Sequence, residues 1–366
     1  MCSIDYQSML KDSLFDFTKK GLLGGLKFYL KTHPCYFTVN TKNEKGYSLL
    51  AVAVIFGHDD IVEYLIKEGA DIHHQVQDGK TILHIAAFFG RFTMIHKLLG
   101  EDGSLLNKQT STGKTPLYYS CQNGYYLATT ALLKSGANVN IPDKNGITPI
   151  YLSCQQGSLW NINTLINYGA NLEYVTKDGF TPLLLACQLK KWNVINILLQ
   201  KGACVNHSST DGILSPVKTL AGYGSDIILE KLITDFKAEI NVDESLFSPL
   251  YCATKNDRFS TMKLLVKNGA VLDLRTKSLI EEKIRTGNSK SIDFLQKFLD
   301  YKEIHDFLSD IEWNKEDQET LMDYTNDIFG KDFFLTEQTN DWINVACKRE
   351  MNISQNTERP TKRSCK

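Results

Sequence analysis

The sequence carries almost no net charge, because its 41 basic and 42 acidic side chains leave a formal charge of −1 over 366 residues. A nucleic-acid-binding protein usually shows a basic domain or stripe, so this balance argues against a nucleic-acid partner. The sequence also lacks an apolar run close to the roughly 18–20 residues that a membrane helix needs. Its first residues, MCSIDYQSMLKDSLFDF, lack the basic and then apolar layout of a signal peptide. We therefore expect a cytoplasmic protein without a membrane span.

Chemical motifs are missing as well. The nine cysteines are odd in number and never form CxxC, which argues against a secreted disulfide framework and against a zinc module. There is no GxSxG, HExxH or Walker A motif, and no GxGxxG placed between a strand and a helix. The sequence thus predicts no enzyme, no metal site and no cofactor.

What the sequence does contain is a repeated phrase. TPLYYSCQNG at 115–124 returns as TPIYLSCQQG at 148–157. Remnants of the same phrase recur every 33 or 34 residues, and each can be aligned on a Thr or Ser, at Ser48, Thr81, Thr115, Thr148, Thr181, Ser215 and Ser248. A glycine precedes five of these positions by two residues, at Gly46, Gly79, Gly113, Gly146 and Gly179. A fixed period of this length indicates stacked structural repeats.

Each repeat has the local signals of two short helices. The Thr115 hydroxyl can cap a helix, and Pro116 suits the first turn, where its missing N–H is no loss. Gly124 is placed to end that helix, and Gly136 to end a second one over 125–135. Neither helix could bury its apolar side alone, so each must pack on its neighbours.

The stretch ILHIAAFFG at 82–90 retains His84 and a double alanine. With the 33-residue period and the G-x-T-P-L-H-x-A pattern, the chain resembles the ankyrin-repeat family. The resemblance covers seven repeats over about 41–275. It implies an all-α solenoid of β-hairpin loops and antiparallel helix pairs, with a C-terminal helical segment. We expect a helical cap at 1–40, a capping helix pair at 276–301, acidic amphipathic helices at 302–345, and a disordered basic tail at 346–366.

The repeated cysteines invite a chemical interpretation. Cys121, Cys154 and Cys187 each lie six residues after their Thr, on the helix side turned into the stack. Neighbouring helices pack about 8–10 Å apart, whereas disulfide partners need Cα atoms within about 7 Å. We therefore expect these thiols to be small buried hydrophobes. His84 is expected to hydrogen-bond between hairpin loops, and a metal site at His73 and His74 is the less favoured alternative.

The family binds partners mostly through its concave side, which is formed by the hairpin residues and by the two residues before the glycine that ends each first helix. Exposed aromatic residues there are typical hot spots, and amides can satisfy the backbone of an extended peptide. The bland alternative is that the Phe pairs only cover the N-terminal cap. The predicted partner-binding residues are Tyr47, Phe56, Phe88, Phe89, Lys114, Gln122, Asn123, Lys144, Gln155, Gln156, Lys177, Phe180 and Gln188.

Lysines recur at the hairpin tips, at Lys80, Lys114, Lys144 and Lys177. They favour an acidic partner, or the chain's own acidic residues 303–341 folding back as an autoinhibitory segment. We predict a monomeric, non-catalytic adaptor that binds a peptide or protein segment. Two alternatives stay open for residues 302–366, which could make the chain a substrate receptor of a ubiquitin ligase or a microbial effector in a host cytosol. A small catalytic accessory segment there is a further possibility.

Overall fold

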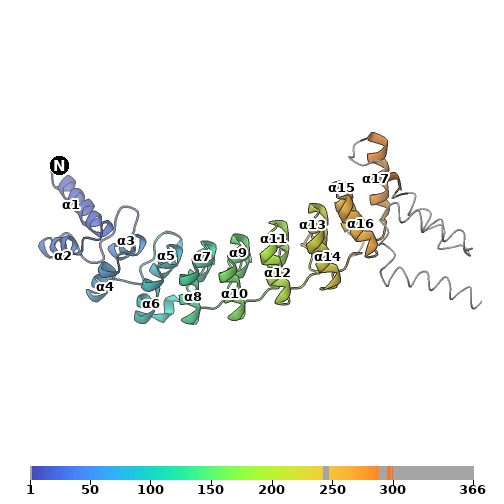
Figure 1. Cartoon of the computed structure of the whole chain (residues 1–366). Helices are drawn as coiled ribbons and strands as arrows, with labels where there is room; N and C mark the ends of the chain where they lie inside the picture. Colours follow the sequence, from blue (N-terminus) through green and yellow to red (C-terminus); the bar gives the residue numbers. More distant parts are fainter. Residues whose placement is uncertain (1, 242–246, 288–294, 298, 300–366) are drawn as a thin grey trace, which may run out of the picture. The chain divides into compact units, whose positions relative to one another are not determined.

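The computed structural model describes residues 2–241, 247–287, 295–297 and 299 (Figure 1). These residues belong to two compact units, one ending at Pro216 and the other beginning at Val217, and each unit is described by itself. Throughout the described ranges the structure is helical, and the only extended pairing is two isolated bridges. The acidic segment and the basic tail expected at 302–345 and 346–366 lie outside the described residues.

The first unit begins with a helix pair that precedes the repeats. Helix α1 (Cys2–Lys19) packs on α2 (Leu23–Thr32) and on the first helix of the first repeat. Leu14 and Leu26 are completely buried in this contact. The His58 ring donates from Nε2 to the Lys19 carbonyl at 2.7 Å, and this bond ties the pair to the repeat that follows.

Helix pairs then repeat along the first unit. In each pair the first helix packs on the first helix of the next repeat, and the second helix on the next second helix (Figure 1). The first helices are α3 (Leu49–Phe56), α5 (Ile82–Phe88), α7 (Pro116–Gln122), α9 (Pro149–Gln156) and α11 (Pro182–Gln188). The second helices are α4 (Asp59–Lys67), α6 (Phe92–Glu101), α8 (Tyr126–Lys134), α10 (Leu159–Asn167) and α12 (Trp192–Gln200). Two 3₁₀ turns, η1 (Gln77–Gly79) and η2 (Gly103–Leu105), lie in the connections of the second repeat.

The residues that mark the repeat are also those that start the first helices. Thr115 Oγ1 accepts from the Tyr118 amide at 3.2 Å, and Pro116 is the first helical residue. Thr181 caps α11 in the same way through the Leu184 amide. These bonds satisfy amides that have no partner within the helix, so the helix begins at a fixed residue.

The loops between repeats are tight turns and do not contain paired β-strands among the described residues. In each loop of the first unit one amide donates across the turn, as from Asp143 to the Ile147 carbonyl at 2.9 Å. Successive loops are joined in series, because the Lys144 amide donates to Thr112 and the Lys177 amide to Asn145, both at 3.0 Å. The loops expected as β-hairpins are therefore turns, because a single pair of residues bonds across each one. Backbone hydrogen bonds join each turn to the next.

Glycine is needed where these loops approach each other. Gly146 has φ +79°, and a Cβ there would lie 2.9 Å from the Val175 carbonyl oxygen and 3.0 Å from Thr176 Cα. Both the left-handed conformation and the close backbone contact exclude a larger residue without strain. Close loop-to-loop packing thus explains Gly113, Gly146 and Gly179, whereas an added Cβ would meet no atom within 4 Å at Gly46.

Buried side chains confirm the packing interpretation of the cysteines. Cys121, Cys154 and Cys187 are free thiols with no exposed surface. Burial raises the pKa of the Cys121 thiol to about 11, so the neutral form is held at ordinary pH. These residues fill the contacts between first helices.

The second unit continues with α13 (Pro216–Tyr223), α14 (Asp226–Thr234), α15 (Pro249–Lys255) and α16 (Phe259–Lys267). Helix α17 (Leu274–Thr286) then packs on α15 and is capped directly by Asp273, which accepts from the Thr276 amide at 2.8 Å. Leu295 and Leu299, in the expected second capping helix, are buried. The rest of that helix lies outside the described residues.

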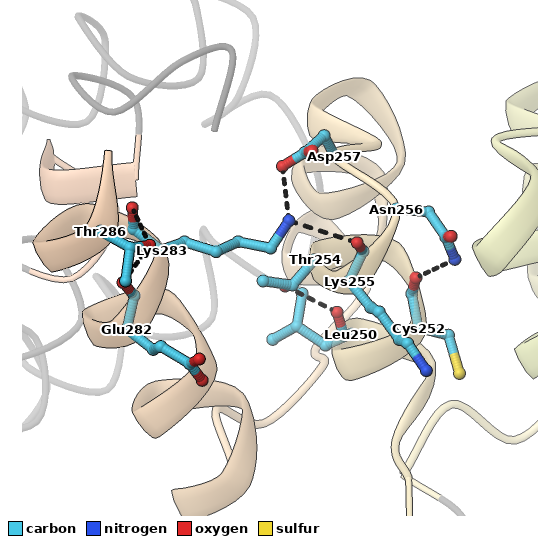
Figure 2. Close-up of polar contacts among 9 residues, drawn as sticks. All are labelled: Leu250, Cys252, Thr254, Lys255, Asn256, Asp257, Glu282, Lys283 and Thr286. Carbon is cyan, nitrogen blue, oxygen red and sulfur yellow. Dashed lines mark hydrogen bonds and ion pairs between the residues drawn. The ribbon is translucent and has the colours of Figure 1, made fainter. Parts of the chain in front are cut away.

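Helix α17 completes the end of α15. Lys283 Nζ lies 2.8 Å from the Asp257 carboxylate and donates to the Lys255 carbonyl at 3.2 Å (Figure 2). In the first unit Arg91 Nη2 likewise donates to the Ile55 carbonyl, at the end of α3. In both units, therefore, a basic side chain from the following element satisfies the last carbonyls of a first helix.

Candidate functional site

The predicted site residues lie along the first helices and their hairpin tips, and we call this surface the first-helix face. None of the thirteen is buried. Lys144 and Lys177 are exposed at tips whose backbones are fixed by the loop-to-loop bonds. Tyr47, Lys114 and Phe180 follow the loop glycines and are half-buried. The scaffold thus presents these side chains from a rigid backbone.

An aromatic cluster forms between the end of α5 and the middle of α7. The rings of Phe88 and Phe89 meet edge to face at 5.1 Å between centroids, and Phe88 meets Tyr119 at 5.9 Å. Phe88 and Phe89 nevertheless stay 41% and 37% exposed. Phe56 is exposed too, but no ring contact joins it to the cluster in the described part of the chain. We call Phe88, Phe89, Tyr118 and Tyr119 the aromatic cluster.

Sequence reasoning missed Tyr118 and Tyr119. Their rings are 5.7 Å apart and both side chains are buried, and Tyr119 also contacts the exposed Phe88. Burial raises the pKa of Tyr118, and the Asp143 carboxylate adds to this through its charge and a hydrogen bond. The sequence did contain a signal for these two residues. They lie three and four residues after Thr115, on the helix side that faces the loops.

Two rim lysines are held over these rings. Lys80 Nζ lies 5.8 Å from the Tyr119 ring centroid, and Lys114 Nζ lies 5.1 Å from that of Tyr118. Cation–π contacts of this kind hold an ammonium without neutralising it. Lys80 is also 3.8 Å from Asp78, whereas Lys114, Lys144 and Lys177 take part in none of the ion pairs formed by the described residues. The rim therefore keeps positive charge.

His84 fixes the backbone beside the cluster. The Thr81 amide donates to His84 Nδ1 at 3.1 Å, so the proton lies on Nε2, which donates to the Lys114 carbonyl at 3.1 Å. Burial lowers the pKa of His84 to about 4, and the ring is neutral at ordinary pH. The hydrogen bond expected between hairpin loops is therefore present, and it holds the backbone of Lys114 in place.

The amide side chains are not equivalent. Asn123 is exposed, but its Nδ2 donates to the Phe88 carbonyl at 2.8 Å and so serves the fold. Gln155, Gln156 and Gln188 are exposed, and they bond to no protein group among the described residues. Gln122 is half-buried, and in the sequence it lies between the aromatic cluster and these three glutamines. The free amides thus belong to the later repeats and the aromatic rings to the earlier ones.

The histidine pair at 73–74 serves the loops. His74 Nε2 donates to the Gly46 carbonyl at 3.0 Å, and His73 lies 3.6 Å from Asp102. No three His, Cys, Asp or Glu side chains of the described residues are placed to hold a metal ion. No described helix has both the length and the apolar character to cross a membrane.

Comparison with known proteins agrees with this architecture. A family model described as ankyrin repeats in three copies matches residues 50–143 and again residues 127–209. Residues 50–209 are thus ankyrin repeats. Ankyrin repeats generally mediate protein–protein interaction and are generally non-catalytic.

Similar curated proteins differ widely in what they are. The inactive serine/threonine-protein kinase TEX14 of Mus musculus is 38% identical over 96 residues, or 26% of this chain and 6% of that protein. The target of rapamycin complex 2 subunit AVO2 of Saccharomyces cerevisiae is 32% identical over 116 residues, or 31% of this chain and 27% of its own. A putative ankyrin repeat protein of fowlpox virus is 36% identical over 94 residues, or 25% and 27% respectively. The chain thus spans 27% or less of the length of each of these relatives.

Proposed function

We propose that this chain is a non-catalytic adaptor that binds an extended acidic segment of a partner protein along the first-helix face. The observation that carries the proposal is the aromatic cluster, in which Phe88 and Phe89 stay exposed although their rings already pack against each other and Phe88 also packs on Tyr119. Large apolar surface held in one place is what an interface hot spot needs.

Preorganisation supports a binding role over simple coverage of the N-terminal cap. The ring contacts hold the two phenylalanines before a partner arrives, so little side-chain entropy remains to be lost on binding. The Asn123 bond to the Phe88 carbonyl fixes the backbone that carries them. An apolar side chain of the partner would therefore meet a formed surface between the end of α5 and the middle of α7.

Charge gives the partner its chemistry. Lys114, Lys144 and Lys177 project from successive hairpin tips, and none is neutralised by an ion pair among the described residues. Exposed pairs with carboxylates add little affinity but speed encounter and select against basic segments. We assign affinity mainly to the phenylalanines and selection of the segment mainly to the lysines.

The exposed glutamines extend the same surface. Gln155, Gln156 and Gln188 can each donate to and accept from the backbone of an extended chain. They lie on α9 and α11, beyond the aromatic cluster along the array. The proposed segment therefore runs from the phenylalanines toward the later repeats.

Two further assignments complete the proposal. Cys35 and Cys204 are exposed free thiols, which supports the cytoplasm, where thiols stay reduced. We also infer that the helices of residues 1–40 cap the repeats of the first unit, because α1 packs on α3, and that α17 caps those of the second unit, because it packs on α15. The end of the expected cap at 276–301 lies outside the described residues. The yeast relative is named as a subunit of a complex, and that name supports an adaptor role.

Peptide display on the full-length chain tests the proposal. Selected peptides should be enriched in Asp and Glu together with an aromatic or large aliphatic residue. The paired change Lys144→Glu and Lys177→Glu should remove the acidic preference while leaving the melting temperature nearly unchanged, because both side chains are exposed. Glu63→Lys with Glu101→Lys, on the second helices, is the matched control and should leave the selection as in the wild type. Selection of basic or purely polar peptides would contradict the proposal.

A further inference from the structure

The second helices of repeats three to five form a surface of unusual composition. Among α8, α10 and α12, Lys134 in the last turn of α8 is the only charged residue. Residues spaced by 33 along the chain line up on the outer side of these helices in three rows. This second-helix face consists of Leu127, Trp160 and Asn193, then Thr130, Asn163 and Asn196, then Lys134, Asn167 and Gln200.

The same positions differ in the two preceding repeats, and on α6 they are Thr93, His96 and Gly100. On α4 they are Asp60, Glu63 and Lys67. Solvated outer sides of helices usually carry such residues, because charge keeps them in water and prevents association. The three rows thus change from charged on α4 to nearly uncharged on α8, α10 and α12, where Lys134 is the one exception.

An exposed aromatic pair occupies this region. Trp160 is 73% exposed, and its ring lies 5.9 Å from that of Tyr126 on the neighbouring second helix. Leu127 beside them is 55% exposed. Depletion of charge together with exposed Trp and Tyr is the composition that distinguishes the core of an interface from the rest of a surface.

We propose that the second-helix face binds the same face of a second copy of this chain, forming a two-fold dimer through α8, α10 and α12. The sequence alone predicts a monomer, because it does not show that Trp160 points outward. In a two-fold contact both copies use the same face, and the side chains close to the axis meet their own equivalents. A face that binds itself must therefore tolerate its own chemistry.

The amide groups of this face meet that condition, whereas Lys134 does not, so the proposed axis lies away from Lys134. Asn163, Asn167, Asn193 and Gln200 each have both a donor and an acceptor, so identical side chains near the axis can hydrogen-bond to each other. Asn163 Nδ2 already donates to the Leu159 carbonyl at 3.0 Å, which leaves its Oδ1 and its second amide hydrogen for the other copy. Carboxylates or ammonium groups in those positions would repel their own copies, as the lysines of the first-helix face would. In the described part of the first unit, charge thus favours self-association through the second-helix face and disfavours it through the hairpin rim.

Sedimentation velocity of the full-length chain between about 1 and 100 µM tests this directly. The wild type should show a concentration-dependent species of twice the monomer mass. Trp160→Glu should raise the dimer dissociation constant about tenfold or more, because it removes the largest exposed ring and adds a like charge on each side. Phe28→Glu on α2, which changes a 62% exposed aromatic residue away from this face, should leave dimerisation unchanged.

A second pair of variants separates charge from loss of packing. Asn163→Lys should weaken the dimer, because it opposes two cations near the axis, whereas Asn163→Gln should preserve it. Gln155→Lys adds the same charge on the first-helix face and should leave the dimer dissociation constant unchanged. A wild type that stays monomeric at the highest concentration overturns the proposal and assigns the face to a different partner. A dimer that survives both Trp160→Glu and Asn163→Lys overturns it as well.

Discussion

Asn161 is a polar residue at a buried position that is apolar in the neighbouring repeats. It is the third residue of α10, where α6, α8 and α12 have Met94, Ala128 and Val194, all buried. Asn161 has no exposed surface, and neither its Oδ1 nor its Nδ2 has a hydrogen-bond partner among the described residues. A buried polar group without partners lowers stability, because its bonds to water are lost and not replaced.

Asn161→Val should therefore stabilise the first unit. The expected gain is about 1–3 kcal/mol in the free energy of unfolding, the penalty attached to one unsatisfied buried polar group. Urea unfolding at low protein concentration measures it. Asn163→Val, at an exposed position two residues away, is the control and should change stability by no more than about 0.5 kcal/mol. A loss of stability on Asn161→Val would show that the amide has a role in the core.

His84 makes the stability of the first unit depend on pH. Its pKa is lowered to about 4 in the folded chain by burial, whereas the unfolded value is about 6.5. Below the unfolded value the unfolded chain binds a proton that the folded chain does not, so stability falls as the pH drops from about 6.5 to about 4. This one group accounts for up to about 3 kcal/mol of the decrease.

His84→Gln should flatten that part of the pH profile. A glutamine at this position can keep the capping bonds with Thr81 but does not titrate. Chemical unfolding at several pH values between 4 and 7 gives the two slopes. His96→Gln, at an exposed residue of α6, should keep the wild-type slope. If the slope of His84→Gln equals that of the wild type, the titration belongs to another group.

At the scale of elements, the loop-to-loop contacts set the register between repeats. One of them depends on Gly146, whereas Gly169, which follows the end of α10, has a similar φ angle in different surroundings. Gly146, at φ +79°, faces the backbone of the next loop, whereas Gly169, at φ +83°, has no atom within contact of an added Cβ. The pair separates backbone conformation from close packing.

Gly169→Ala should cost about 1 kcal/mol, the penalty of the left-handed conformation alone. Gly146→Ala should cost about 1–3 kcal/mol more, because its methyl group forces the loops apart and weakens the Lys177 bond to Asn145. Thermal or urea unfolding of the two variants measures the difference. Equal losses for both would show that the loops separate without resistance.

Periodicity explains which parts of the fold could be predicted. The Thr-Pro pairs locate the starts of α7, α9 and α11, because proline chemistry acts locally. Thr115 and Thr181 also cap their helices, whereas the Thr148 side chain makes no capping bond on α9. The partners of a side chain are not local. The burial of Tyr118 and Tyr119, the use of the Asn123 amide within the fold, and the outward direction of Trp160 depend on neighbouring repeats, so the sequence did not reveal them.

At the scale of the whole molecule, each repeat contacts mainly its neighbours, so the two faces of the first unit are separate surfaces. Side chains on the first helices and hairpin tips can bind one partner while α8, α10 and α12 contact another. Changes on one face should leave the other unaffected. An adaptor needs this independence, and a stacked array supplies it without a hinge or a linker.

The central claim is that the exposed phenylalanines of the aromatic cluster bind the partner segment. Isothermal titration with a display-selected acidic peptide tests it most directly, comparing the wild type with the double variant Phe88→Ala and Phe89→Ala, and with Phe28→Ala as a matched exposed control. The account predicts a dissociation constant raised about 30-fold or more in the double variant, and unchanged in the control. Melting temperature and the helical signal verify that the variants fold. Equal affinity for wild type and a folded double variant would contradict the account.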